Sequence, residues 1–153
     1  MDPRELRIAC RELMETSPAA YVTTIGRDGY PHTRAMLNLR NREQYPRLVR
    51  LYAGHETDLL TYFTTNTPSL KVAQVAANPK AAVYYCDPAT FRGVMLGGDL
   101  EVIDDSALRH AVWTDGWERY YPGGPDDPDH TVLRLCPRFA EGWWSGERIE
   151  FRL

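Results

Sequence analysis

One polar strand-to-helix turn carries the residues best suited to chemistry in this sequence. Residues 62–79 read YFTTNTPSLKVAQVAANP, which is a run of β-branched and aromatic residues, a turn and then a helical segment. The hydroxyls of Thr65 and Ser69, the Lys71 ammonium and the free N–H groups of the first helical turn could face one point. A helix N-terminus with an added cation and hydroxyls is a good receptacle for a phosphate. The alternative on these residues alone is an ordinary, well-capped turn.

A second cation comes from a separate part of the chain. In the strand-like segment HTRAMLNL, alternate side chains face the same side, so Arg34 shares a face with Met36. A phosphate with nearly two negative charges favours more than one cation, and Arg offers a bidentate fork. Arg34 and Lys71 are therefore the two candidate phosphate ligands. The alternative at Arg34 is a surface charge.

Other chemistries find little support in the sequence. The four histidines lie far apart, without the spacing of metal ligands, so we expect no metal site. Asp126, Asp127 and Asp129 resemble half a calcium loop, but the glycine and terminal Glu of an EF-hand are missing, which favours a solvated acidic turn. No GxSxG or GxGxxG motif occurs, and no side chain presents itself as a catalytic acid, base or nucleophile.

Composition limits the class of protein. The chain has 153 residues, which suits a single domain over residues 1–153. Its net charge of −3 argues against nucleic acid or an anionic membrane as partner. No apolar run approaches the roughly 20 residues that span a bilayer. The charged N-terminus is unlike a signal peptide, and the three scattered cysteines fit reduced thiols, so we expect a soluble, cytoplasmic protein.

Short strands are expected to dominate the fold that positions these residues. A hairpin is predicted between residues 19 and 39, with its turn at the two glycines around Asp28. Helices are predicted at residues 3–16, at 68–77 with Thr67 as N-cap and Pro68 at the first position, and at 106–121. Further strands are predicted at residues 47–53, 62–65, 81–86, 91–103, 131–136, 138–144 and 149–153. This mainly β pattern suits a small antiparallel β-barrel with appended helices.

The order and spacing of several motifs resemble the flavin-binding split barrels related to pyridoxamine 5′-phosphate oxidase, and in particular their general stress protein branch. The matching motifs are Arg34–Leu37, Thr65–Asn66 with Ser69 and Lys71, Asn78–Pro79, Arg92–Val94 leading to Glu101, and Trp117–Trp143. The resemblance covers nearly the whole chain. The resemblance implies a homodimer of six-stranded antiparallel split barrels of the FMN-binding type, with two FMN molecules at the subunit interface.

The resemblance also implies a set of flavin contacts. The implied cofactor-binding residues are Arg34, Met36, Leu37, Thr64, Thr65, Ser69, Lys71, Trp143 and Arg152. Arg34 and Lys71 would hold the phosphate, with Ser69 beside them. Trp143 and Arg152 would reach the flavin from the other subunit, and the remaining residues would line it.

Two departures from the oxidase pattern affect the expected substrate. Gly93 stands where the oxidase has a glutamine that touches the flavin. Glu150 stands where it has a substrate-binding histidine, although Arg148 matches its substrate arginine. A carboxylate there would repel a substrate phosphate, so we expect that this protein does not oxidise pyridoxamine phosphate.

The sequence therefore predicts an FMN-binding protein, with an oxidoreductase acting on an unidentified small molecule as the first hypothesis. The flavin would carry the chemistry, and the protein would orient it and control access to it. The second hypothesis is a non-enzymatic flavin-binding stress or sensor protein. A third keeps the split barrel but replaces FMN with deazaflavin or haem.

Overall fold

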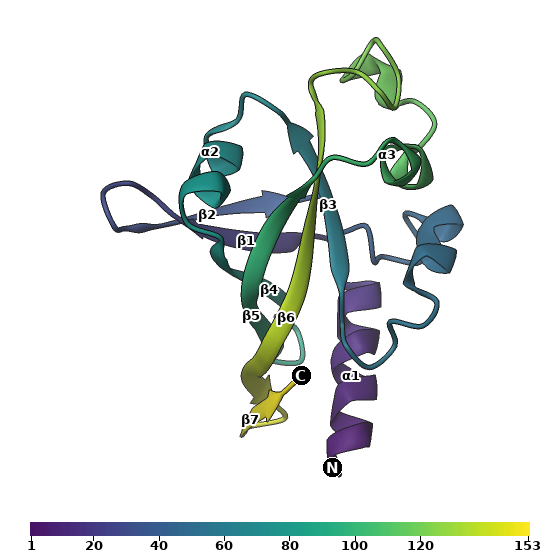
Figure 1. Cartoon of the computed structure of the whole chain (residues 1–153). Coiled ribbons are helices and arrows are strands. Elements are labelled where there is room, and N and C mark those ends of the chain that lie inside the picture. Colours follow the sequence, from purple (N-terminus) through teal and green to yellow (C-terminus); the bar gives the residue numbers. More distant parts are fainter.

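The computed structural model describes residues 1–153 and consists mostly of antiparallel β-sheet with a few helices (Figure 1). The α-helices are α1 (Pro3–Thr16), α2 (Leu70–Ala77) and α3 (Ser106–Val112), and the 3₁₀ helices are η1 (Pro46–Tyr52) and η2 (Trp117–Arg119). The strands are β1 (Ala20–Ile25), β2 (Pro31–Met36), β3 (Thr61–Asn66), β4 (Lys80–Asp87), β5 (Arg92–Ile103), β6 (His130–Trp144) and β7 (Glu147–Arg152). None of the helices has the length and apolar character needed to cross a bilayer.

The sheet is an open, curled barrel. Six antiparallel strands follow the order β2-β1-β4-β5-β6-β3, and β7 pairs with β6 as a seventh strand. Because β2 and β3 end this path without pairing to each other, the sheet does not close. The register of β5 against β6 shifts between Gly97 and Gly98, where the glycine-rich sequence predicts a bulge. The predicted mainly β split barrel with appended helices is confirmed.

The two faces of the sheet have different environments. Alternate residues of β1, β4 and β5, including Val22, Val83 and Leu96, are fully buried in a core that α1 completes. The intervening residues face outward, and Tyr21 and Tyr84, which pair across β1 and β4, are both exposed. The outer face of the sheet therefore keeps aromatic side chains that nothing in the chain covers.

A second, smaller core lies on the far side of β3. It joins η1, α3 and η2 to the start of β6 and is rich in aromatic residues. His130 lies within it, against the rings of Trp113, Trp117 and Tyr121, with ring centroids between 4.8 and 6.3 Å apart. Burial lowers the pKa of His130.

Three predictions about elements are wrong. The two strands predicted at residues 131–136 and 138–144 form one continuous strand, β6, which runs through Pro137. Residues 47–53 form most of η1 rather than a strand, because Pro46 starts a helical turn that buries Leu48 and Tyr52, four residues apart. The helix predicted at 106–121 ends at Val112. Gly116 then takes a left-handed φ of 94° that reverses the chain before η2 begins.

Candidate functional site

The two predicted phosphate ligands lie next to each other. Arg34 on β2 and Lys71 in the first turn of α2 are both half-buried. Burial lowers the pKa of the Lys71 ammonium, and the positive charge of Arg34 lowers it further. Lys71 Nζ donates to Thr65 Oγ1 at 3.0 Å. No carboxylate forms an ion pair with either cation, so this corner of the molecule carries two uncompensated positive charges.

The hydroxyl of Ser69 adds an unused hydrogen-bonding group two residues before Lys71. Ser69 is the N-cap of α2, but its side chain caps no backbone N–H. Its Oγ is buried and has no hydrogen-bond partner. Buried polar atoms without partners are rare in folded proteins and costly. Two unpaired cations and an orphaned hydroxyl are a donor set that fits a phosphate group.

Arg34 is held by groups that the sequence reasoning missed. Its Nη1 donates to Thr24 Oγ1 at 2.8 Å and to the Val22 carbonyl at 3.3 Å, and its Nη2 donates to Gln74 Oε1 at 3.3 Å. Burial lowers the pKa of the Arg34 guanidinium. The available signal was Gln74 itself, a polar residue three positions after Lys71 in an otherwise apolar helical segment.

The buried face of α2 also differs from expectation. The apolar residues of this segment, which are Leu70, Val72, Ala73, Val75 and Ala76, predict the buried side of an amphipathic helix. The buried residues are instead Gln74 and Val75, whereas Leu70 is 66% exposed. The helix is therefore rotated so that its polar residues, Lys71 and Gln74, lie toward the sheet rather than toward solvent.

A pocket of about 450 Å³ opens beside Lys71. Its lining residues are Pro18, Ala19, Ala35, Met36, Leu37, Thr64, Thr65, Asn66, Lys71, Trp117, Tyr120 and Tyr121. The structure thus brings together five of the nine predicted residues, at the ends of β2 and β3 and the start of α2. Arg34 and Ser69 lie beside Lys71, outside this lining. The aromatic side of the pocket, which we call the aromatic wall (Trp117, Tyr120 and Tyr121), was not predicted as part of a site.

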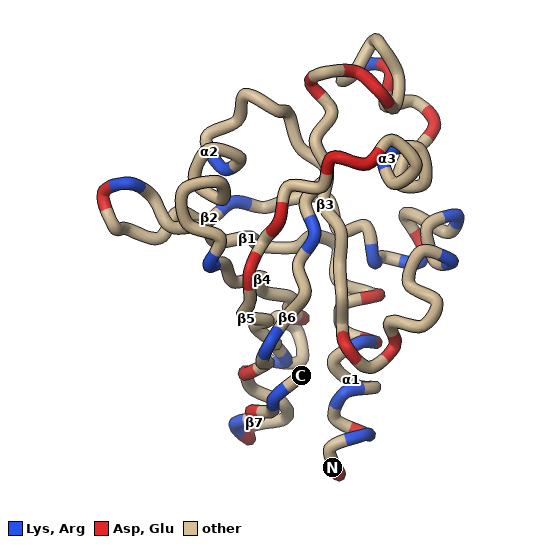
Figure 2. Tube along the Cα trace, viewed as in Figure 1, with Lys and Arg blue, Asp and Glu red and all other residues tan.

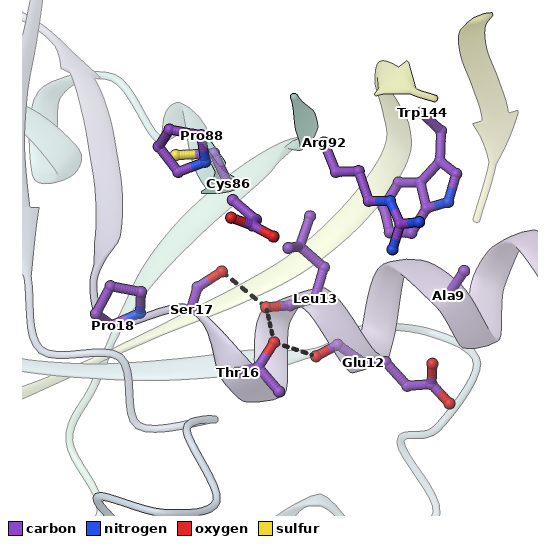
Figure 3. Close-up of a pocket in the computed structure, with 11 residues that line it drawn as sticks. Ala9, Glu12, Leu13, Thr16, Ser17, Pro18, Cys86, Pro88, Arg92 and Trp144 are labelled. Carbon is purple, nitrogen blue, oxygen red and sulfur yellow. Dashed lines mark hydrogen bonds between the residues drawn. The ribbon is translucent and has the colours of Figure 1, made fainter. Parts of the chain in front are cut away.

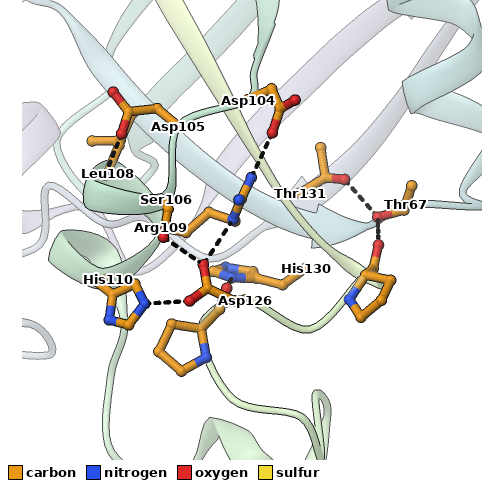
Figure 4. Close-up of polar contacts among 12 residues, drawn as sticks. Thr67, Asp104, Asp105, Ser106, Leu108, Arg109, His110, Asp126, His130 and Thr131 are labelled. Atoms are coloured by element: carbon orange, nitrogen blue, oxygen red, sulfur yellow. Dashed lines mark hydrogen bonds and ion pairs between the residues drawn. The ribbon is translucent and has the colours of Figure 1, made fainter.

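A polar cluster around Asp126 holds the loop that follows the aromatic wall (Figure 4). The Asp126 carboxylate accepts hydrogen bonds from His110 Nε2 at 2.6 Å and Ser106 Oγ at 2.7 Å, and these bonds lower its pKa to about 2. Arg109 pairs with both Asp126 and Asp104. Figure 2 shows acidic positions along the segment that leads into α3 and in the loop above it. Both Arg109 and His110 have a carboxylate partner, so we interpret this cluster as one that fixes the loop in place and not as a binding site.

The same loop is fastened to the turn that precedes α2. Thr67 N donates to the Asp129 carbonyl at 2.8 Å, and Thr67 Oγ1 donates to the Pro128 carbonyl at 2.6 Å. Thr67 Oγ1 also lies 2.7 Å from Thr131 Oγ1. These long-range bonds occupy the Thr67 hydroxyl, so the predicted N-cap role of Thr67 is wrong and Ser69 takes that position.

The last two predicted residues lie far from this pocket within one chain. Trp143 lies on β6, where it pairs with Gly93 of β5, and it is 59% exposed on the outer face. The Arg152 guanidinium lies 5.8 Å from the Phe139 ring centroid. Figure 1 places β7 and the C-terminus at the opposite end of the sheet from α2. Trp144 faces the other side of the strand, as expected for adjacent residues, and packs against the core.

A second cavity, of about 540 Å³, lies between α1 and the turn from β4 to β5 (Figure 3). The Arg92 guanidinium lies 5.2 Å from the centroid of the Trp144 ring on one side of it, and α1 forms the opposite side. Glu12 and Asp87 also line it, so its charges are mixed. It contains none of the predicted cofactor-binding residues, and we therefore assign the candidate site to the pocket beside Lys71.

Comparison with known proteins agrees with this fold. The family described as pyridoxamine 5′-phosphate oxidase matches residues 6–144, and the chain belongs to this family. A solved structure from Clostridium acetobutylicum, of a protein related to general stress protein 26 of B. subtilis, is 33% identical. It superposes with a TM-score of 0.79, with 100% of this chain and 97% of that chain covered. A pyridoxine/pyridoxamine 5′-phosphate oxidase of Pseudomonas paraeruginosa is 26% identical over 170 residues, which cover 88% of this chain and 72% of that protein.

The fold alone extends to proteins named for other ligands. A haem-binding protein of Mycobacterium smegmatis shares it with 15% identity and a TM-score of 0.66, covering 95% of this chain and 57% of that one. An F420 reductase shares it with 21% identity and a TM-score of 0.53, covering 83% and 91%. The predicted family and its general stress protein branch are confirmed, whereas the choice of cofactor needs a separate argument.

Proposed function

We propose that this protein binds FMN and acts as an FMN-dependent oxidoreductase on a small molecule. The observation that carries the proposal is the pair of uncompensated cations, Arg34 and Lys71, beside a pocket of about 450 Å³. A phosphate monoester carries close to two negative charges at neutral pH, which matches two cations better than the single charge of a diester does. This favours FMN over a deazaflavin linked through a phosphodiester.

Each residue of the site has a defined task in this proposal. Arg34 and Lys71 neutralise the phosphate, and the orphaned hydroxyl of Ser69 donates a hydrogen bond to it. The ends of β2 and β3, at Met36–Leu37 and Thr64–Thr65, line the flavin, while the aromatic wall limits access of water. When bound, FMN supplies the electron-transfer chemistry, and the protein supplies binding and orientation.

The proposed assembly is a homodimer with flavin at the interface. The outer face of the sheet presents aromatic rings close to its backbone, because the Tyr84 ring lies across Gly93 and the Phe139 ring lies across Gly97, where any side chain would clash with them. We propose that a second copy of the chain covers this face. Trp143 and Arg152 lie far from the pocket of their own chain, so they would contact the flavin in the pocket of the other subunit. The candidate site is incomplete without that copy.

Pyridoxamine phosphate is not the proposed substrate. Arg148, which matches the oxidase's substrate arginine, pairs with Glu150 at 3.1 Å and lies 3.7 Å from Glu141. Two carboxylates around one exposed guanidinium leave no net positive charge for a substrate phosphate. This arrangement supports a small-molecule substrate other than pyridoxamine phosphate.

The proposal is tested by absorption spectroscopy of the purified protein before and after addition of FMN, with the mass in solution measured in parallel. We expect flavin bands, about one flavin per chain, and a dimer. A protein that ignores FMN, riboflavin and deazaflavin alike would refute the proposal, and retention of haem or deazaflavin in preference to FMN would replace the cofactor. Reduced flavin is then offered quinones, oxygen and nitro compounds. Reoxidation faster than that of free reduced FMN supports an enzyme, and reoxidation no faster supports a non-enzymatic flavin-binding protein.

A further inference from the structure

The Arg34 guanidinium belongs to a closed triangle of polar groups. Arg34 Nη1 donates to Thr24 Oγ1 at 2.8 Å, Arg34 Nη2 donates to Gln74 Oε1 at 3.3 Å, and Thr24 Oγ1 donates to Gln74 Oε1 at 2.5 Å. The three residues come from β2, β1 and α2, so the triangle joins three of the elements around the cations. Thr24 is fully buried and Gln74 is 5% exposed, so water competes little for these bonds.

The direction of each hydrogen bond in the triangle follows from the chemistry of its groups. Arg34 can only donate, so Gln74 must turn its amide oxygen toward the guanidinium. Thr24 then accepts from Arg34 and has one proton left, which goes to the same amide oxygen. A single arrangement satisfies all three groups, and the orientation of the Arg34 guanidinium is therefore fixed.

Gln74 holds Arg34 without neutralising it. A carboxylate at position 74 would bind the guanidinium more strongly but would cancel its charge. The amide accepts the same hydrogen bonds and leaves both positive charges of the site available. Gln74 lies three residues after Lys71, which places both side chains on one face of α2 and toward Arg34.

We propose that Gln74, supported by Thr24, is a positioning residue of the phosphate site that orients Arg34 while preserving its charge. This inference rests on the proposed FMN function. A guanidinium already held in its binding orientation loses less conformational entropy when a ligand binds. The triangle therefore strengthens binding of the phosphate group and leaves binding of the flavin ring unaffected.

The test compares FMN with riboflavin, which lacks the phosphate, in Gln74→Leu and Gln74→Glu. We expect Gln74→Leu to weaken FMN binding about tenfold and Gln74→Glu about a hundredfold, because the carboxylate also cancels a charge. Riboflavin affinity stays within about twofold in both. Gln44→Glu is the matched control, since Gln44 is an exposed glutamine elsewhere and the change in net charge is identical.

Thr24→Val is a second variant that keeps shape and removes only the hydroxyl, and it is expected to reduce the preference for FMN about threefold to tenfold. If the position 74 variants do not fold, Thr24→Val alone tests whether the triangle strengthens binding of the phosphate group. An unchanged ratio of FMN to riboflavin affinity in the folded variants overturns the inference while the proposed function stands. Equal binding of FMN and riboflavin by the unmodified protein overturns the phosphate site, and this inference with it.

Discussion

Two polar clusters flank the turn between β3 and α2, and they differ in charge balance. In the Asp126 cluster, Arg109 and His110 both contact carboxylates. At the other cluster, Arg34 and Lys71 contact only hydroxyl, amide and carbonyl oxygens. Both clusters are rich in hydrogen bonds, so the number of bonds does not separate them. The charge left over does separate them, and it supports the second cluster as the proposed anion-binding site.

The uncompensated cluster carries a cost that the compensated one lacks. Two neighbouring positive charges repel each other, and partial burial disfavours both, as the lowered pKa values of Arg34 and Lys71 indicate. This repulsion and partial burial offset part of the stability that the hydrogen bonds of Arg34 and Lys71 contribute. Retaining the two charges is consistent with a binding role, in which a functional site is less stable than its surroundings.

The largest effect is expected from removing both free cations. Arg34→Ala with Lys71→Ala should weaken FMN binding about a thousandfold, because each charge-assisted contact is worth roughly ten- to a hundredfold. The melting temperature should not fall, since a repulsion is removed together with the contacts. Arg4→Ala with Arg27→Ala removes two exposed cations without ion pairs and is the control. Unchanged FMN affinity in the variant that lacks Arg34 and Lys71 would show that the uncompensated cluster does not bind the phosphate.

A pH titration sharpens the role of Lys71. Its pKa is lowered from the ordinary lysine value of 10.5, so the free protein loses this charge at a lower pH than an exposed lysine would. As the pH rises, FMN affinity should therefore begin to fall before pH 10.5 is reached. The total loss should be up to about a hundredfold once the lysine is neutral. Lys71→Arg should remove this fall over the same range. An identical pH profile for both proteins would show that Lys71 does not contact the phosphate.

The contribution of the partner subunit should be smaller. Trp143→Ala is expected to weaken FMN binding about tenfold and to change flavin fluorescence, since it removes one aromatic contact with the ring. Phe91→Ala is the control, because Phe91 is 84% exposed in a turn and belongs to no predicted site. If the two variants behave alike, Trp143 has no part in the site.

The compensated cluster should affect stability and leave binding nearly unchanged. Asp126→Asn is expected to lower the melting temperature by a few degrees and to change FMN affinity less than about threefold. Because the pKa of Asp126 is lowered to about 2, its contribution to stability is complete above the ordinary Asp value and is lost as the pH falls. The difference in melting temperature should thus vanish between about pH 4 and pH 2. A large loss of FMN affinity at neutral pH would contradict the comparison.

The sequence predicted those structural features that depend on residues close together in the chain, such as a helix cap, a hairpin turn and a β-bulge. The capping box at Asp2 is present, with its carboxylate accepting from the N–H groups of Arg4 and Glu5. The hairpin of β1 and β2 and the bulge at Gly97–Gly98 also follow from nearby residues. The structure also brings Arg34 and Lys71 close together, as joint binding of one phosphate requires, and their phosphate-binding role stays a prediction.

Long-range bonds explain what the sequence could not predict. The Thr67 hydroxyl looks like a cap locally, but it is taken by Pro128 and Thr131, more than 60 residues away. Gln74 looks like an exposed residue of α2, and only the positions of β1 and β2 reveal its contacts with Thr24 and Arg34. These partners are distant along the chain, and no local pattern encodes them.

The most direct test of the central claim is the affinity of the unmodified protein for FMN and for riboflavin, each measured by calorimetry at low and high salt. The two ligands share the flavin ring and differ in the phosphate. We predict that FMN binds at least about a hundredfold more tightly at low salt, and that the preference shrinks as salt screens the charges. Equal affinities at both salt concentrations would contradict the claim that Arg34 and Lys71 form a phosphate site.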